Sequence, residues 1–157
     1  MFSNLNEKKL LTLRRNDSNN PLASYSKHVF ELDGYEWPSV EHYYQAMKFG
    51  DPKYVEKIRQ AANPDEAAKL GKSRWHKKRK DWDKVKVTFM TRGTYIKCRT
   101  YPEIAEMLMN TGDLHITEVS QYDYFWGCGR DTRGTNAFGT MLMDIRNKLR
   151  EELELGS

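Results

Sequence analysis

The sequence predicts a mainly α-helical protein with a small β element, an α+β fold in which an N-terminal β-hairpin precedes a compact set of helices. Capping residues followed by proline occur at two points, and apolar residues recur at helical spacing in two long segments. One Asp-Gly turn between β-prone segments indicates the hairpin. A chain of 157 residues can form one core, so we expect a single domain over residues 1–157, with its core at about 22–150.

The hairpin is expected at residues 28–37, with Asp33-Gly34 as its two-residue turn. Pro38 interrupts the second strand, and the Ser39 hydroxyl can cap a helix that begins directly after it. The sequence therefore places the start of the first helix at a defined residue.

Shorter elements follow the first helix. Asp51-Pro52 and Asn63-Pro64 each put a capping residue before a proline at the first helical position, and the second of these helices should end at Gly71. A further helix is expected over about 102–112, and a short strand over 115–120.

Two longer helices are expected, one over about 81–98 and one after Asn136. In the first, Gly93 permits close backbone approach, and the inward stripe consists of Trp82, Val85, Phe89 and Ile96. In the second, the buried stripe consists of Phe138, Met141, Leu142, Ile145 and Leu149. We expect its exposed side to carry Arg146, Lys148, Arg150 and Glu151.

The formal net charge of +4 is concentrated in one segment, residues 72–80. Such a segment, including the Lys77–Lys80 run, attracts phosphate on a nucleotide, a sugar phosphate or nucleic acid. A solvated basic loop is the equally simple alternative. The two cysteines, Cys98 and Cys128, form neither a disulfide framework nor a metal-binding spacing, so we expect reduced thiols in a cytoplasmic protein. The sequence also gives no indication of a metal or a cofactor, and no apolar run is long enough to span a membrane.

The segment Trp37–Phe49 combines charged groups with aromatic rings in the first turns of a helix. Glu41, Tyr44, Gln45 and Lys48 share one helix face, which we interpret as one wall of a polar pocket. In the alternative interpretation, Glu41 only caps its helix and Lys48 is solvated at its tip. His42 is expected to be a hydrogen-bonded structural residue rather than a catalytic one.

A second dense segment, residues 118–131, is too rich in glycine for a helix and too aromatic for an ordinary surface loop. Asp123 supplies a second carboxylate, Trp126 a flat face, and Gly127 a point where a ligand can approach the backbone. The amides that follow Asn136, at the start of the last helix, could bind a phosphate. Alternatively, the segment is a structural turn in which Asp123 satisfies loop amides.

Several separated motifs occur together in this chain: Trp37-Pro-Ser-Val-Glu-His-Tyr-Tyr-Gln-Ala-Met-Lys-Phe49, Ala67-Ala-Lys-Leu-Gly71, Trp82, Asp123-Tyr-Phe-Trp-Gly127, and Gly134-Thr-Asn-Ala-Phe-Gly139 through Leu142-Met143-Asp144-Ile-Arg146. In order and spacing they resemble the NADAR superfamily over about residues 22–150. YbiA-like members of that family are described as N-glycosidases acting on riboflavin biosynthesis intermediates, and other members are linked to ADP-ribose. The resemblance thus implies hydrolysis of a C1′–N bond in a phosphorylated ribosylaminopyrimidine or an ADP-ribosyl adduct, including ADP-ribosyl-guanine in nucleic acid.

By the same resemblance, the active-site glutamate of the family falls on Glu41, and its functional tryptophan and acidic-aromatic pair fall on Trp82 and on Asp123 with Trp126. A carboxylate at the anomeric carbon can stabilise an oxocarbenium-like transition state or take a proton from water. Lys48 matches the motif lysine, and it or Arg74 would bind phosphate.

One departure from the family concerns its Leu-Ser-Asn-Phe-like motif, because Ser24 stands here in place of the asparagine. Serine is shorter and offers one hydroxyl instead of an amide, so this change bears on substrate identity more than on reaction type. The second functional class compatible with the sequence is a module that binds ADP-ribose, NAD or nucleic acid without turnover. Residues 4–20 are polar and basic, and the sequence pattern assigns them no structure.

Overall fold

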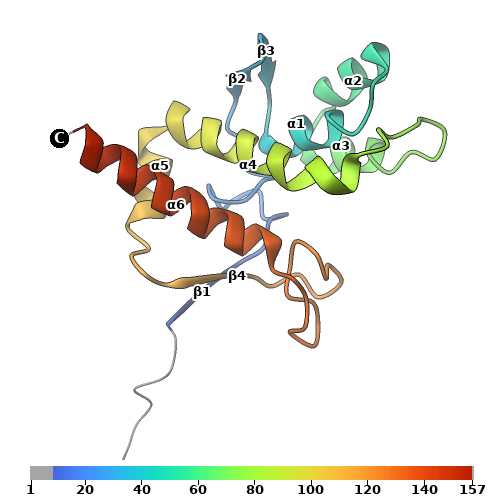
Figure 1. Cartoon of the computed structure of the whole chain (residues 1–157). Helices are drawn as coiled ribbons and strands as arrows, with labels where there is room; N and C mark the ends of the chain where they lie inside the picture. Colours follow the sequence, from blue (N-terminus) through green and yellow to red (C-terminus); the bar gives the residue numbers. More distant parts are fainter. Residues whose placement is uncertain (1–8, 157) are drawn as a thin grey trace, which may run out of the picture. The chain divides into compact units, whose positions relative to one another are not determined.

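A computed structural model of the chain describes residues 9–156 (Figure 1). Residues 4–8 of the polar and basic N-terminal segment therefore lie outside the described range. The described part divides into two compact units, one made of residues 9–14 and 106–156, the other of Arg15–Ala105. Helix α5 (Pro102–Met109) belongs to both, because its first turn lies in the second unit and its last turn in the first.

The hairpin of the Arg15–Ala105 unit is formed as predicted. Strands β2 (Phe30–Leu32) and β3 (Tyr35–Trp37) pair antiparallel, with Phe30 opposite Trp37. Both turn residues have positive φ, 56° at Asp33 and 85° at Gly34, which is the backbone conformation that a tight two-residue hairpin requires.

Helix α1 (Val40–Ala46) lies at the centre of this unit, and all seven of its residues are buried. It packs against α2 (Pro52–Arg59), α3 (Pro64–Leu70) and α4 (Trp82–Thr100). The predicted capping residues are all confirmed: the side chains of Ser39, Asp51 and Asn63 each accept a hydrogen bond from a backbone amide in the first turn of their helix. The two short capped helices α2 and α3 and the long helix α4 thus surround one buried helix that carries many polar groups.

Gly71 does close α3, although its backbone is right-handed, with φ −66°, so a left-handed stop is not the reason for glycine here. A Cβ at this position would collide with the Gln45 side chain. Gly93 on α4 also acts as predicted, because a Cβ there would lie 3.0 Å from the Tyr43 ring and 3.2 Å from Val40.

The inward stripe of α4 differs in part from the prediction. Trp82 is buried, whereas Val85, Phe89 and Ile96 are only half-buried. The fully buried positions lie one step round the helix, at Met90, Gly93, Thr94, Lys97 and Cys98. Lys97 has no solvent exposure, and its ammonium donates to Pro21 O (2.6 Å), Ala23 O (3.0 Å) and Ser26 Oγ (3.0 Å). A lysine therefore occupies a core position because its donors are satisfied.

The other unit is built on a parallel strand pair that the sequence pattern did not predict. Strand β1 (Leu10–Leu13) pairs with β4 (His115–Glu118), Leu10 lying opposite His115. Figure 1 shows the two strands side by side, and α6 (Ala137–Leu155) packs on β4. The strand expected near 115–120 and the buried stripe of the last helix are thus both confirmed.

The prediction that Arg146 lies on the exposed side of α6 is wrong. Its side chain is buried, and Nη1 donates to Thr111 Oγ1 and Leu114 O, both at 2.9 Å. These acceptors lie in the segment between α5 and β4, so this guanidinium ties that segment to α6. Between residues 9 and 156, no helix combines the length and the apolar character needed to cross a bilayer.

Candidate functional site

Glu41 lies in the first turn of α1 and has no solvent exposure. Its Oε2 accepts hydrogen bonds from Arg15 Nη1 (2.6 Å) and Ser24 Oγ (2.9 Å). Its Oε1 accepts one from Gln45 Nε2 (2.7 Å), one helical turn further on. Both carboxylate oxygens are therefore held in fixed positions by side chains from three segments of the chain.

These contacts show that Glu41 is not the cap of its helix. The cap of α1 is the Ser39 hydroxyl, which accepts from His42 N at 3.1 Å. The Glu41 side chain instead contacts the segment before the hairpin, and its backbone N–H donates to Ser24 O (2.9 Å). Burying a charged carboxylate is costly unless hydrogen-bond donors compensate for the lost water, and three side chains do so here. A side chain that only capped its helix would not need them, which points to a role beyond capping.

Lys48 lies just after α1, at the end of the same helix face. Its Nζ is 5.5 Å from the centroid of the Tyr44 ring and 5.9 Å from that of Trp82, and it donates weakly to Gly71 O (3.4 Å). Burial lowers the pKa of Lys48 to about 8, although the charge of Glu41 acts in the opposite direction. At pH 7 a pKa of about 8 leaves about a tenth of this side chain as the uncharged amine.

Aromatic rings surround this cation. Tyr44 and Trp82 lie 5.1 Å apart at a tilt of 49°, and Trp82 also stacks on Phe89. Trp82 is buried, so it contributes both to the packing of α4 and to the environment of Lys48. Glu41, Lys48 and Trp82 are thus brought together in one region, as the sequence predicts.

Arg15 and Tyr25 are further members of this cluster that the sequence reasoning did not single out. The Arg15 guanidinium lies over the rings of Tyr25 (5.8 Å) and Tyr44 (5.9 Å) as well as against Glu41. Burial, followed by the nearby Glu41 charge, raises the pKa of Tyr25 to about 12, so this phenol stays protonated. No local pattern marks Arg15, because the residues it contacts follow it by 9 to 29 positions.

His42 is a structural residue, as expected. Its Nε2 lies 3.0 Å from Ala61 O, and because a carbonyl can only accept, Nε2 carries the proton. Nδ1 then accepts from Ser39 Oγ at 2.7 Å. Burial lowers the pKa of His42, which favours this neutral tautomer.

In the other unit, Asp123 begins a tight turn. Its Oδ1 accepts from Phe125 N (3.1 Å) and Trp126 N (2.8 Å), as in the structural alternative considered for this residue. Trp126 is buried between Phe125 and Phe138, both at edge-to-face angles. A Cβ at Gly127 would lie 2.8 Å from Asp123 O, so this turn requires glycine.

Glu118, at the end of β4, is a second fully buried carboxylate and was not singled out from the sequence. Its Oε1 accepts from Ser120 N (2.7 Å) and Ser120 Oγ (2.6 Å). Its Oε2 has no hydrogen-bond partner within residues 9–156 and lies beside Gly127. The signal for this residue was its position at the end of a buried strand, directly before the glycine-rich turn.

Asn136 joins the turn to the last helix. It has a left-handed backbone, with φ 54°; its Oδ1 accepts from Glu118 N (2.8 Å) and its Nδ2 donates to Ile116 O (2.9 Å). Both ends of its amide therefore fix the start of α6 against β4. Arg74 lies elsewhere, exposed in the loop between α3 and α4, and is not among the residues that contact Glu41.

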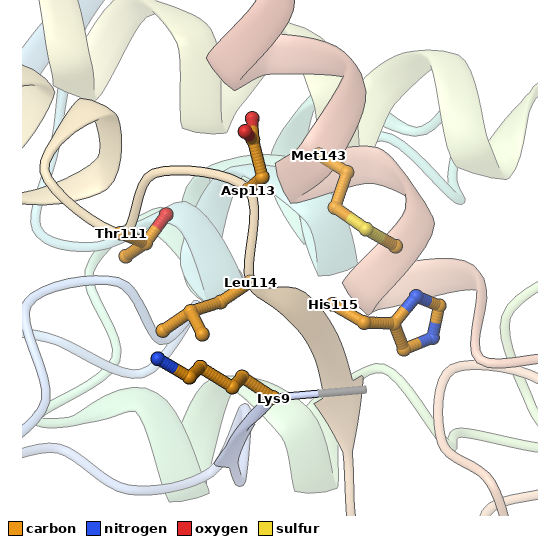
Figure 2. Close-up of a pocket in the computed structure, with 6 residues that line it drawn as sticks. All are labelled: Lys9, Thr111, Asp113, Leu114, His115 and Met143. Carbon is orange, nitrogen blue, oxygen red and sulfur yellow. The ribbon is translucent and has the colours of Figure 1, made fainter. Parts of the chain in front are cut away.

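A surface groove of about 440 Å³ lies in the unit formed by residues 9–14 and 106–156, and none of the predicted site residues lines it. Figure 2 shows its lining side chains, which are Lys9, Thr111, Asp113, Leu114, His115 and Met143. Within residues 9–156, no three His, Cys, Asp or Glu side chains are arranged to bind a metal ion.

Comparison with known proteins gives consistent results. The model of the NADAR domain matches residues 1–150. The chain is 40% identical over 136 residues to N-glycosidase Npun_R5314 of Nostoc punctiforme, covering 85% of this chain and 87% of that one. It is 34% identical over 149 residues to the riboflavin biosynthesis protein VVA0006 of Vibrio vulnificus, covering 95% of this chain and 41% of the relative.

The third relative is N-glycosidase YbiA of Escherichia coli, 34% identical over 133 residues, covering 85% of this chain and 83% of that one. Its NMR structure superposes with a TM-score of 0.83 at 32% identity, covering 92% of this chain and 87% of YbiA. The fold is thus that of an α+β N-glycosidase domain. The chain belongs to the NADAR domain family.

Proposed function

We propose that this N-glycosidase cleaves the C1′–N bond of a phosphorylated ribosyl compound, with Glu41 at the anomeric carbon. The hydrolase class itself follows from the family and from relatives named N-glycosidases at 34–40% identity. The substrate is accordingly a small glycosyl compound. We further propose that this compound carries a phosphate or an ADP-ribosyl group.

The observation that carries the proposal is the state of Glu41. A fully buried carboxylate with both oxygens oriented by Arg15, Ser24 and Gln45 is a preorganised negative charge. Breaking a C1′–N bond builds positive charge on the ribose ring, and a fixed carboxylate stabilises that charge without reorganising. The same oxygens can take a proton from the attacking water.

Lys48 could have one of two roles in the reaction. As an ammonium it would bind a substrate phosphate, with Arg74 as a second candidate. As the neutral amine that a pKa of about 8 makes accessible, it could attack C1′ and displace the base, which leaves after taking up a proton; the glycosylamine formed in this way opens to an imine. Trapping with borohydride distinguishes the two, because only attack by the amine leads to a reducible covalent adduct.

We assign supporting roles to the turn of the other unit. Asp123 would orient the ribose hydroxyls or take part in acid-base chemistry, and Trp126 would present a flat face to the base. Gly127 would let a ligand approach the backbone, and the amides after Asn136 would receive a phosphate.

The experiment compares two substrates, a ribosylaminopyrimidine phosphate and guanine-linked ADP-ribose, and measures release of the free base. We expect release from at least one of them by the natural chain. Glu41→Gln keeps the shape of the side chain and should lower kcat by about a thousandfold or more. Full activity in this variant would contradict the assignment of Glu41.

The alternative function is binding of ADP-ribose, NAD or nucleic acid without turnover. It uses the same cations and rings but does not require an oriented carboxylate. Binding of both compounds without release of base, in a chain shown to be folded, would support this alternative. Release from guanine-linked ADP-ribose alone would exclude a role in riboflavin metabolism.

A further inference from the structure

The loop between α3 and α4 carries an unusual density of positive charge. We call residues 72–80 the basic loop; six of its nine residues are Lys or Arg and none is acidic. Arg79 pairs with Asp81, with Nε to Oδ1 at 2.6 Å. The remaining five are exposed and have no carboxylate partner within residues 9–156: Lys72, Arg74, Lys77, Lys78 and Lys80.

One large ring accompanies these cations. The Trp75 side chain is 94% exposed, whereas Trp37, Trp82 and Trp126 are each at most 6% exposed. Tryptophan is rarely left this exposed in a folded protein without a partner. Its backbone amide is nevertheless fixed by a hydrogen bond to Ser73 Oγ (3.2 Å), so the ring projects from an ordered position.

The rest of the basic loop is anchored to α2 and to the segment directly after α1. The His76 ring stacks on Tyr54 at 3.5 Å with an interplanar angle of 9°. Lys78 forms a β-bridge with Phe49, and Arg79 N donates to Lys48 O at 2.8 Å. A groove of about 480 Å³ lies here, lined by residues 49–51 and 75–80. These contacts hold the backbone that carries the cations and the indole in a defined position.

We propose that the basic loop, together with Trp75, is a docking surface for single-stranded nucleic acid. Phosphates would lie along the unpaired cations, and an unstacked base would stack on the indole, which is the combination that single-strand binders use. A duplex offers no free base face to the ring. A lipid surface would require a larger apolar face, and Trp75 is the large exposed apolar side chain of the loop.

The surface is continuous with the region around Glu41. Lys48 accepts from the loop through its carbonyl, and the charges of Lys78 and Lys72 contribute to lowering the pKa of its ammonium. A strand bound on the loop would therefore lie next to the end of α1. Arg74 belongs to this loop and is also a candidate for binding the substrate phosphate, so the variants below leave it in place. Oligonucleotide binding is measured without turnover, so its failure and the failure of the proposed reaction are distinguishable.

The test uses the full chain and a fluorescently labelled single-stranded oligonucleotide of mixed sequence, with anisotropy recorded over a range of salt concentrations. We expect binding at low salt, with log K falling against log salt at a slope of magnitude about 3. Lys77→Ala/Lys80→Ala should reduce the magnitude of that slope by about 1. Trp75→Ala should weaken binding about tenfold without changing the slope, and Trp75→Phe should restore most of it.

Matched controls remove the same groups elsewhere in the same unit. Lys27→Ala/Lys57→Ala deletes two exposed lysines, and Tyr35→Ala deletes an exposed ring that is 55% accessible. Both should bind like the natural chain. Absence of binding at low salt, equal affinity for a duplex of the same sequence, or tighter binding to phosphatidylserine vesicles would each overturn the proposal. Equal binding by Trp75→Ala would reduce the surface to a non-specific polyanion site and would also overturn it.

Discussion

At the residue scale, the geometry of Glu41 depends on two side chains that precede the hairpin. Arg15 and Ser24 both contact Oε2, and Arg15 also donates to Ser24 Oγ at 3.3 Å. The serine that replaces the family's asparagine is therefore a partner of the central carboxylate. The comparison of substrates above measures the substrate choice of the chain that carries this serine.

Arg15 should act as a positioning residue for Glu41. Arg15→Ala removes the donor to Oε2, and we expect kcat to fall by about 10- to 100-fold with little change in KM. Arg15→Lys should retain more activity than Arg15→Ala, because it keeps the positive charge. It should remain below the natural chain, because lysine lacks the planar guanidinium group. Millimolar guanidinium ion should restore part of the activity of Arg15→Ala. A loss that guanidinium does not repair, or that appears only in KM, would argue against positioning.

Gly71 leaves room for the Gln45 side chain and thereby affects the position of the Glu41 carboxylate. In Gly71→Ala the new methyl group would overlap the Gln45 side chain, which holds Glu41 Oε1. We expect the free energy of unfolding to fall by about 1–3 kcal/mol and kcat to fall with it. Gly50→Ala is the control, because nothing lies within 4 Å of a Cβ there. Equal stability of the two variants in urea titrations would contradict this account.

At the element scale, α1 is a short helix whose position is determined by its cap and by the elements packed around it. Seven residues form too little helix to be stable alone, so α1 needs the contacts to α2, α3 and α4. The same burial leaves polar side chains without water. Glu41 and His42 find partners within the protein, whereas Gln45 Oε1 has no hydrogen-bond partner within residues 9–156.

Ser39→Ala should destabilise the protein more than Asn63→Ala, although both remove an N-cap. Ser39 is fully buried and also hydrogen-bonds His42 Nδ1, whereas the Asn63 cap is exposed. We expect a loss of about 1 kcal/mol for Asn63→Ala and about 2–3 kcal/mol for Ser39→Ala, measured by urea unfolding. Equal losses would mean that the Ser39–His42 contact contributes nothing.

At the scale of the whole molecule, buried ionisable groups predict how stability depends on pH. Burial lowers the pKa of Lys48 and Lys97 from 10.5 to about 8. Between these values the unfolded chain binds more protons than the folded one, so the free energy of unfolding rises with pH. Burial raises the pKa of Cys98 from 9.0 to about 11 and that of Tyr25 from 10.0 to about 12, which reverses the trend at higher pH.

We therefore expect stability to increase between about pH 7.5 and pH 9 and to level off or fall above that range. Urea titrations across this range measure the slope, to which each lysine contributes at most about 1.4 kcal/mol per pH unit. Lys97→Met should reduce the slope by about half, whatever its effect on absolute stability. An unchanged slope in Lys97→Met would show that this lysine keeps an ordinary pKa in the folded state.

We also propose that the two compact units unfold together as one domain over residues 1–157. Helix α5 runs through the boundary between them without a linker, and the family model covers both. Calorimetry should then give a single transition with equal calorimetric and van't Hoff enthalpies.

Much of the architecture could be predicted because its signals are local. The hairpin turn, the proline-preceded helices and the stripe of α6 are each encoded within a few residues. Strand β1 could not be predicted in this way, because its partner β4 lies far along the chain and four residues carry no pattern of their own. Arg146 was misplaced because a charged residue on a helix is normally exposed, and its acceptors come from another segment.

By itself, then, the sequence determined which segments form helices and turns, and it marked Glu41, Lys48, Trp82 and the Asp123 turn as the regions of interest. The tertiary structure decided which side chains hold them. Arg15 and Ser24 reach Glu41 only after the chain has folded. The same holds for Lys97, which anchors residues 21–26 around Ser24. The physical reason is that secondary structure follows from neighbours in sequence, whereas a buried charge must be satisfied by whichever donors the fold brings to it.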